Sequence, residues 1–247
     1  MSMNSKNKIL FIKNWIKEYV DSMPNPAQSL VIGISGGIDS SVSSTLSAMA
    51  GLKTIVLSMP IKQKSLQYDL SLKHQEWLIK NFKNVEAHIV NLDKLFETFE
   101  NSLSKFNNDL GLANSRARLR MTTLYQVAAA NKGIVVGTGN KVEDFGVGFY
   151  TKYGDGGVDI SPIADCNKTD IWEMGRELNI LKEIIDAAPT DGLWDDGRTD
   201  EGQLGLKYSE LEEAMNNPNS PNREKYDKIR KLNLHKMEPI PVCKIPN

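Results

Sequence analysis

The sequence of 247 residues is poor in the side chains that usually hold zinc, with two cysteines and three histidines. Cys166 and Cys243 lie far apart, and the sequence has no C-x-x-C pair and no Cys/His cluster. A zinc site with the usual ligand spacing is therefore excluded. Two isolated thiols are typical of a reducing compartment, so we expect a cytoplasmic protein.

Long apolar runs and an excess of one charge are also missing. No stretch approaches the roughly 20 consecutive apolar residues of a membrane span. Lysines interrupt the apolar residues of the N-terminus and no small-residue cleavage site follows, so we do not expect a signal peptide. A net charge of −1 gives no general attraction to nucleic acid or to an anionic membrane, and we expect neither as a partner.

Apolar runs alternate with helix-like segments in the first part of the chain. The length suits one large α/β domain over 1–247. Such alternation is typical of a doubly wound, mostly parallel sheet flanked by helices, a Rossmann-like fold whose ligands bind beyond the carboxyl ends of the strands. The predicted strands are 29–34, 53–60, 85–92 and 133–140. The first predicted helix is amphipathic and ends near Pro24, and the second ends at Gly51. The other predicted helices are 69–82, 95–103, 114–131, 171–178 and 207–215. We expect the tail, 216–243, to be rich in turns.

The stretch G-I-S-G-G-I-D-S-S at 33–41 follows the first predicted strand and begins the next helix. Glycines let backbone N–H groups approach phosphate oxygens, yet the lysine of a Walker loop is missing. The serines can donate hydroxyl hydrogen bonds, and a carboxylate suits Mg²⁺ bound to phosphates. The alternative without a ligand is a strand-to-helix turn in which serine and aspartate cap the helix. We predict nucleotide contacts at Gly33, Ser35, Gly36, Gly37, Asp39 and Ser40.

A strand followed by S-G-G-x-D-S resembles the pyrophosphate-binding loop of the ATP-pyrophosphatase group, the adenine nucleotide alpha hydrolase type of fold. Further segments make the chain similar to the NAD synthetase family over most of its length. These segments are N-S-R-A-R-L-R-M, G-T-G-N-K-V-E-D, T-K-Y-G-D-G-G, N-K-T-D-I-W, A-P-T-D-G-L-W and D-E-G-Q-L-G-L-K-Y.

The resemblance implies an ammonia-dependent carbon–nitrogen ligase. Such an enzyme amidates deamido-NAD to NAD with ATP and Mg²⁺ through an acyl-adenylate, releases AMP and pyrophosphate, and works as a homodimer. The apolar Ile and Trp side chains of the first helix suggest a face for the second subunit. The resemblance also assigns residues: Asp39 and Glu143 to the metal; Thr138, Lys168 and Thr190 to ATP; Arg118, Lys152, Asp159, His235 and Lys236 to deamido-NAD; and Asp155 to ammonia.

The chain departs from the family pattern in two places. One residue more than usual stands between Glu143 and Lys152, and the strand end L-S-M-P lacks an arginine that some members place near the nucleotide. In R-A-R-L-R, Arg118 lies opposite the other two arginines on a helix, so we expect Arg116 and Arg120 to form ion pairs at the surface or a subunit interface.

Other functions remain open from the sequence. One is another adenylating amidase of the same loop group, either GMP-synthetase-like or acting on tRNA, although the latter favours a basic surface. Another is a non-catalytic sensor of nucleotides. No nucleophilic cysteine segment for a glutamine amidase is present, so we expect free ammonia as the donor. We also predict that the Gly- and Asp-rich segment 191–202 is a lid over the nucleotides.

Overall fold

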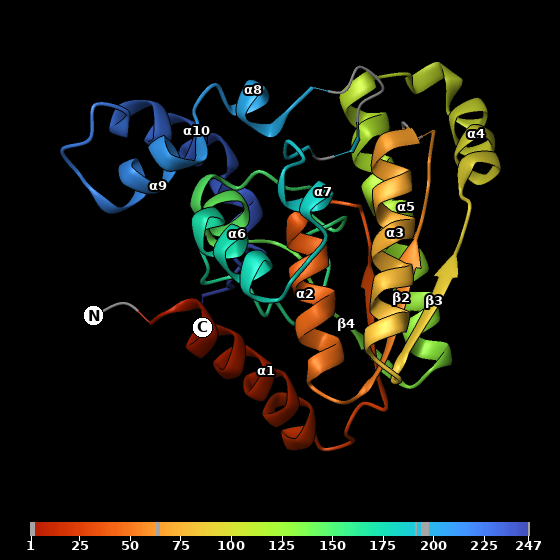
Figure 1. Cartoon of the computed structure of the whole chain (residues 1–247). Coiled ribbons are helices and arrows are strands. Elements are labelled where there is room, and N and C mark those ends of the chain that lie inside the picture. The colour runs from red at the N-terminus through yellow and green to blue at the C-terminus, as the bar shows by residue number, and fades with distance from the viewer. Residues whose placement is uncertain (1–2, 63–64, 191, 194–197, 247) are drawn as a thin grey trace.

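A parallel sheet of four strands in the order β3-β2-β1-β4 forms the centre of the part of the chain that the structure describes. A computed structural model describes residues 3–62, 65–190, 192–193 and 198–246 (Figure 1). The strands are β1 (Ser29–Gly33), β2 (Lys53–Ser58), β3 (Val85–Ile89) and β4 (Gly133–Val135). The prediction of a doubly wound parallel sheet is confirmed. Because β2 and β4 flank β1 on opposite sides, the strand order reverses there, and the loops after β1 and β4 border the crevice where such sheets bind ligands.

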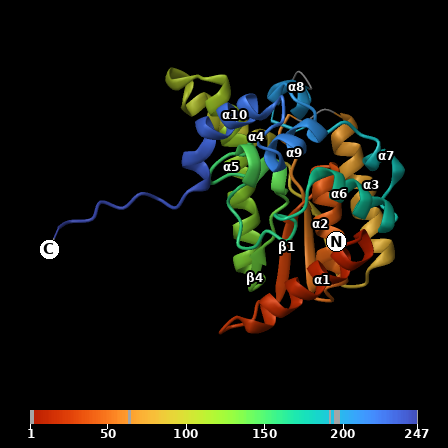
Figure 2. The same ribbon diagram turned by 90° about the vertical axis from the view of Figure 1, so that its left-hand side faces the viewer.

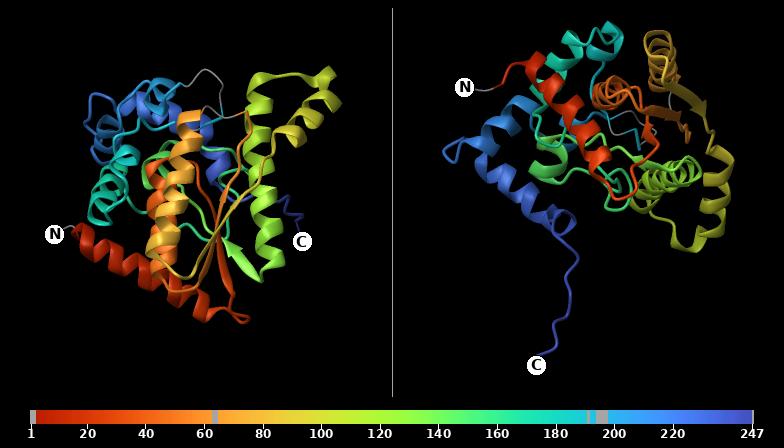
Figure 3. Two further views of the ribbon diagram at one scale, coloured as in Figure 1. Left: turned by 45° about the vertical axis from the view of Figure 1, so that its right-hand side comes forward. Right: turned by 90° about the horizontal axis from the view of Figure 1, so that it is seen from below.

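Different helices cover the two faces of the sheet (Figure 3, left). Leu30 and Ile32 of β1 pack on one face, whereas Val31, between them, packs on the other, as the alternation of a strand requires. The helices are α2 (Ile38–Met49) and α3 (Ser65–Asn81) on the first face, and α4 (Asp93–Ser102), the 3₁₀ turn Ser104–Phe106 and α5 (Asp109–Ala130) on the second. Within the described ranges, no helix is both long and apolar enough to cross a membrane.

The first helix, α1 (Ser5–Ser22), packs against α2 and α6 (Lys168–Glu177). Its isoleucines at helical spacing, Ile9, Ile12 and Ile16, are buried in the core under α2. The helix itself was correctly predicted. The isoleucines that suggested a face for a second subunit are already covered within the chain, so they are not available for such a contact.

Among the described residues after α6, four further helices follow: α7 (Lys182–Ile185), α8 (Asp200–Leu204), α9 (Tyr208–Asn216) and α10 (Arg223–Met237). The prediction of a turn-rich tail over 216–243 is wrong for α10. Few residues of this helix are apolar, but Tyr226 and Ile229, three apart, pack into a third apolar cluster against α9 and the segment after β4. Figure 2 shows that only the residues after α10 extend away from the body of the protein.

The segment after β4 is a π-helix, Lys141–Val147, and it contains Glu143. Asn140 caps it, and Gly148 ends it in a left-handed conformation with a φ of 70°. The hydrogen bonds of a π-helix span one residue more than those of an α-helix, and single-turn π-helices are frequent at functional sites. The segment in which the sequence analysis expects an additional residue, between Glu143 and Lys152, begins in this turn.

Candidate active site

A cavity of about 500 Å³ opens at the carboxyl ends of β1, β2 and β4. Met59 and Pro60 after β2 form part of its wall, and α6 contributes Lys168. All the residues predicted to contact ATP, the metal or ammonia line this cavity: Gly33, Ser35, Gly36, Gly37, Asp39, Ser40, Thr138, Glu143, Asp155, Lys168 and Thr190. The fold thus brings residues from widely separated segments to one site.

The 33–41 loop is tightly shaped around Gly36. This glycine has a φ of +90°, and a Cβ atom on it would lie 2.4 Å from the Gln67 carbonyl oxygen of α3. No other residue suits both the conformation and the space. The Gly37 amide donates to the Ser35 hydroxyl at 3.2 Å, and the Ser40 hydroxyl donates to the Gly37 carbonyl at 3.0 Å. Because hydroxyls rotate, these serines can offer hydrogen bonds to an anion at the N-terminus of α2.

The centre of the site is an ammonium group between two carboxylates. Lys168 Nζ lies 2.6 Å from Asp39 Oδ2 and 2.8 Å from Glu143 Oε1. The Lys168 side chain is only 2% exposed, so this charge is satisfied almost entirely by protein atoms. Lys168 is the first residue of α6, where the helix dipole disfavours a cation, and the two carboxylates outweigh that effect.

Two side chains that the sequence analysis assigned no role, Asn140 and Tyr208, hold these carboxylates in place. Asn140 donates to Asp39 Oδ1 at 2.9 Å, and its own Oδ1 accepts from the Glu143 amide at 3.1 Å. The Tyr208 hydroxyl contacts Glu143 Oε1 and, at 3.1 Å, Asp200 Oδ2. Asn140 and Tyr208 both stand in motifs that carry the family resemblance, G-T-G-N and L-K-Y. Their place in these motifs was the feature of the sequence that could have identified them as site residues.

The two carboxyls titrate differently because their surroundings differ. Burial raises the pKa of Asp39, and Lys168 only partly opposes this. Burial would also raise the pKa of Glu143, but the Lys168 ammonium and the Tyr208 hydroxyl outweigh it and the pKa is lowered. Burial acts to lower the pKa of Lys168, whereas Asp39 and Glu143 raise it, and the net direction is upward. Lys168 is therefore a permanent cation at neutral pH.

A second acidic pair, Asp144 and Asp155, lines the same cavity. Asp155 Oδ1 accepts from the Thr151 amide at 2.9 Å, which fixes the carboxylate within the 150–157 turn. Burial and the neighbouring carboxylates, Asp155 foremost, raise the pKa of Asp144 well above its usual value. The Asp144 carboxylate packs over Gly139, where a Cβ atom would lie 1.9 Å from it. The sequence analysis assigned no role to Asp144, although it stands directly after Glu143 in the motif G-T-G-N-K-V-E-D.

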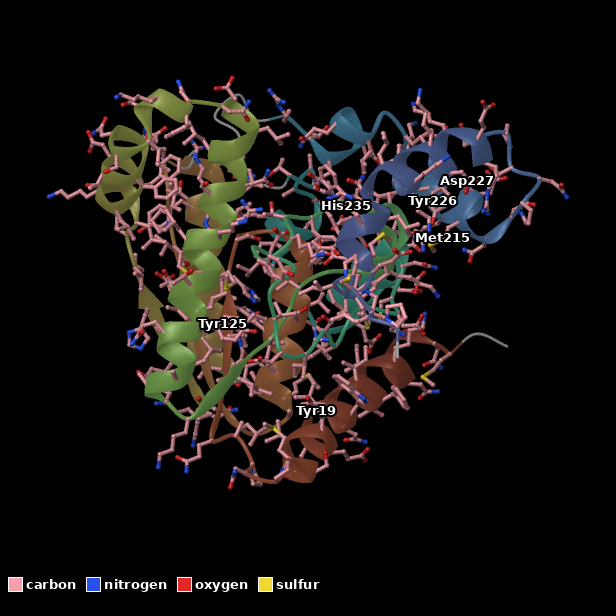
Figure 4. The ribbon with its side chains drawn as sticks, turned by 180° about the vertical axis from the view of Figure 1, so that it is seen from behind. Tyr19, Tyr125, Met215, Tyr226, Asp227 and His235 are labelled. Carbon is pink, nitrogen blue, oxygen red and sulfur yellow. The ribbon has the colours of Figure 1, made fainter. Side chains whose placement is uncertain are left out.

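The residues assigned to deamido-NAD lie beside the cavity and do not line it. Arg118 donates to the Lys152 carbonyl at 3.3 Å, and Lys152 Nζ donates to the His235 carbonyl at 3.1 Å. Lys236 Nζ donates to the Tyr150 carbonyl at 2.7 Å, so these four residues form a continuous belt between α5 and α10. Figure 4 shows this side of the molecule, with His235 on α10.

The fifth of these residues, Asp159, is held by β4 and α5. It accepts from the Val135 amide at 2.7 Å and from the Tyr125 hydroxyl at 3.0 Å. Tyr125 is labelled on α5 in Figure 4. These contacts give Asp159 a structural function at the edge of the sheet, whatever it contributes to binding.

The prediction that Arg116 and Arg120 lie at the outer surface is wrong. Arg116 is buried, stacks over the Phe96 ring at 4.9 Å and donates to the Leu193 carbonyl at 2.9 Å. Arg120 lines the cavity and donates to the Met59 carbonyl at 3.0 Å. Burial under α4 and the loop after β2 explains both positions. Arg120 also places a guanidinium group at the strand end that lacks the arginine of some family members.

The predicted lid, 191–202, is described only in part, because residue 191 and residues 194–197 lie outside the described residues. Of the remainder, Gly192, Leu193, Arg198, Thr199 and Asp200 line the cavity. The described part of the segment therefore lies where a lid would have to lie.

Asp39 and Glu143 form a donor set that suits Mg²⁺. This ion is usually bound through one or two carboxylates together with substrate phosphates. Both carboxylates reach the same point from separate elements, the first turn of α2 and the π-helix, next to the 33–41 loop. Over the described ranges, no group of three or more His, Cys, Asp or Glu side chains could hold a metal by protein ligands alone. The site therefore fits Mg²⁺ that arrives with a phosphate ligand.

Comparison with known proteins gives one consistent result. The profile of the NAD synthase family matches residues 8–244. The NH(3)-dependent NAD(+) synthetase of Carboxydothermus hydrogenoformans is 37% identical over 220 residues, which is 87% of each chain. The solved structure of an NMN synthetase from Francisella tularensis is 31% identical, covers 100% of both chains and has a TM-score of 0.88. An NH3-dependent NAD synthetase from Campylobacter jejuni is 23% identical over 98% of this chain and 100% of that chain, with a TM-score of 0.79, and supports the fold.

Proposed function

The chain belongs to the NAD synthase family, and on that premise we propose that it uses ATP and ammonia to convert the carboxylate of deamido-NAD into the carboxamide of NAD. The chain is a carbon–nitrogen ligase. The observation that carries the proposal is the meeting of the 33–41 loop with Glu143 and Lys168 in one cavity. A GMP-synthetase-like enzyme shares such a loop, but the family match over 8–244 favours a nicotinate substrate.

The reaction has two steps. A carboxylate oxygen of the substrate attacks the α-phosphorus of ATP and pyrophosphate leaves; ammonia then attacks the acyl carbon and AMP leaves. The 33–41 amides, the serine hydroxyls and the α2 N-terminus would hold the departing pyrophosphate, with Lys168 and Thr190 beside it. Bound Mg²⁺ would neutralise charge on the phosphates, and Asp39 and Glu143 would hold it.

Asp155 and Asp144 are suited to the second step. Ammonium must lose a proton before its nitrogen can attack, and a carboxylate in the cavity can hold the ammonium ion and take that proton. Asp155 is fixed by the Thr151 amide and lies in the same cavity as the phosphate-binding loop. We assign ammonia binding to Asp155, with Asp144 as the neighbouring acid.

The test is turnover of deamido-NAD with ATP, Mg²⁺ and ammonium, with AMP and pyrophosphate measured as products. Asp39→Asn should abolish it, because a neutral amide is a weak Mg²⁺ ligand. Asp165→Asn is the matched control, since Asp165 is an exposed aspartate, paired with Lys141 at 2.9 Å, that does not line the cavity. Release of ADP and phosphate, or nucleotide binding without any turnover, would contradict the proposal; the second result would indicate a sensor.

A second substrate is favoured by one observation. The NMN synthetase structure matches the whole chain at a TM-score of 0.88. The same chemistry applied to nicotinic acid mononucleotide gives NMN, because the reacting nicotinate is identical and only the AMP half is absent. Parallel assays of kcat/KM with the mononucleotide and the dinucleotide decide between the two. A preference for the mononucleotide would correct the substrate and leave the amidation standing.

The donor and the assembly complete the proposal. Ammonium should support turnover and glutamine should not, since we expect no amidase segment in this chain.

We propose a homodimer, because the belt of Arg118, Lys152, His235 and Lys236 lies outside the cavity, where a second subunit could cover the substrate. Sedimentation at the assay concentration, with specific activity followed on dilution, tests this. Full activity in a monomer would refute it.

A further inference from the structure

Lys168 contacts both of the carboxylates that the proposed function gives to Mg²⁺. Its Nζ atom lies 2.6 Å from Asp39 Oδ2 and 2.8 Å from Glu143 Oε1. A divalent ion that binds both carboxylates must approach them to about 2.1 Å. An ammonium group and a divalent cation repel each other strongly at the few ångströms that this would leave between them. The two cations therefore compete for one place.

The carboxylates are held by contacts that do not involve Lys168. Asn140 donates to the other oxygen of Asp39, and Tyr208 donates to Glu143. If the lysine moves, both acids keep a partner and their positions. The ammonium group is the member of the cluster on the longest flexible stem, four methylene groups, so it is the one that can move.

The phosphate-binding loop offers Lys168 a second position. Lys168 lines the cavity together with Gly37, Ser40 and Thr190, so a phosphate in that cavity is close to its ammonium group. Moving from a carboxylate pair to a phosphate leaves the ammonium group paired throughout. It also exposes both carboxylates to the incoming ion.

The following inference rests on the proposed function. We propose that Lys168 is an internal cation: its ammonium group occupies the Mg²⁺ position in the nucleotide-free protein and moves onto a phosphate when ATP binds. Lys168 is then a positioning residue that makes metal binding depend on nucleotide. By linkage, ATP and the metal must raise each other's affinity by the same factor. The site takes up Mg²⁺ only together with ATP and does not bind the free ion beforehand.

The test measures binding of Mn²⁺, as a spectroscopic probe for Mg²⁺, by electron paramagnetic resonance of the full chain without nucleotide. Lys168→Met removes the charge and keeps the stem, and it should bind Mn²⁺ at least about tenfold tighter than the unaltered protein. Lys168→Gln, whose amide can still donate to both carboxylates, should behave in the same way and covers the case in which the methionine variant fails to fold. Lys141→Met is the matched control, because Lys141 lies in the π-helix that carries Glu143 but pairs with the exposed Asp165, and it should change nothing.

Two further measurements complete the design. Adding Asp39→Asn to Lys168→Met should abolish the tighter Mn²⁺ binding. ATP should increase Mn²⁺ affinity less in Lys168→Met than in the unaltered protein, because the lysine no longer has to leave. Folded lysine variants that bind Mn²⁺ no tighter than the unaltered protein would overturn the inference. Since these assays do not follow NAD formation, that result is distinct from a failure of the proposed reaction.

Discussion

His74 makes the stability of this protein depend on pH in a way that can be calculated. The residue lies in α3 with no exposed surface, and its Nε2 is 3.0 Å from the Ser44 hydroxyl of α2. That hydroxyl donates to the Ser41 carbonyl, so it accepts from Nε2–H and leaves the lone pair on Nδ1. Within the described residues, Nδ1 has no hydrogen-bond partner. Protonation would bury a charge without an acceptor, and burial lowers the pKa of His74 from 6.5 to about 4.

The sign and size of the effect follow from this pKa. Above pH 6.5 the imidazole is neutral in the folded and the unfolded chain, so the full stability is present. As the pH falls from 6.5 to about 4, the unfolded chain takes up a proton that the folded chain does not. The free energy of unfolding therefore decreases by about 1.4 kcal/mol for each pH unit. Over the whole window this amounts to about 3 kcal/mol, a large part of the roughly 5–15 kcal/mol of a typical domain.

His74→Gln isolates this contribution. The glutamine amide can still donate to Ser44, but it does not titrate. We expect the free energy of unfolding, measured in urea from about pH 7 to about pH 4, to fall less steeply in the variant than in the unaltered protein. His88→Gln, at an exposed position of β3, leaves His74 in place, so the difference in slope between His74→Gln and the unaltered protein should not appear in it at pH values above about 5. A constant difference between His74→Gln and the unaltered protein over this range would refute the reasoning.

Three other predictions concern the site and the thiols. Gly36→Ala should destabilise the protein by more than about 1 kcal/mol in urea unfolding and should weaken ATP binding in calorimetry. The reason is that φ at this position is +90° and the new Cβ atom would meet the α3 backbone. An unchanged stability and ATP affinity would refute this loop geometry. Tyr208→Phe should lower kcat, although Trp172 still packs against the ring. The variant should lose about 1.5–3 kcal/mol of stability, because a hydrogen bond to the Glu143 carboxylate is lost. An unchanged kcat would remove Tyr208 from the site. A disulfide reagent at mildly alkaline pH should modify the exposed Cys243 at once and Cys166 only after unfolding. The reason is that burial raises the pKa of the Cys166 thiol to about 11. Rapid reaction of both thiols in the folded protein would contradict the burial of Cys166.

Local sequence patterns determined the sheet and the position of the glycine- and serine-rich 33–41 loop at its carboxyl edge. Buried strands are short and apolar, and the glycines and serines that follow β1 are close together in the chain, so both were visible without a fold. Motif spacing also carried the family, because T-K-Y-G-D-G-G and G-T-G-N specify residue types at fixed positions. In contrast, α10 was missed, because its few apolar residues form a stripe only against the π-helix that they cover.

The pairings inside the site were decided by tertiary structure alone. Lys168 is 129 residues from Asp39 and 25 from Glu143, and no local pattern indicates that one ammonium group bridges both acids. The directions of Arg116 and Arg120 likewise depend on α4 and the loop after β2, which a helical wheel does not contain. A sequence states which charges are available. Their positions, and so their pKa values and the cations they can hold, depend on burial and on distances across the fold, because electrostatic energies change steeply with both.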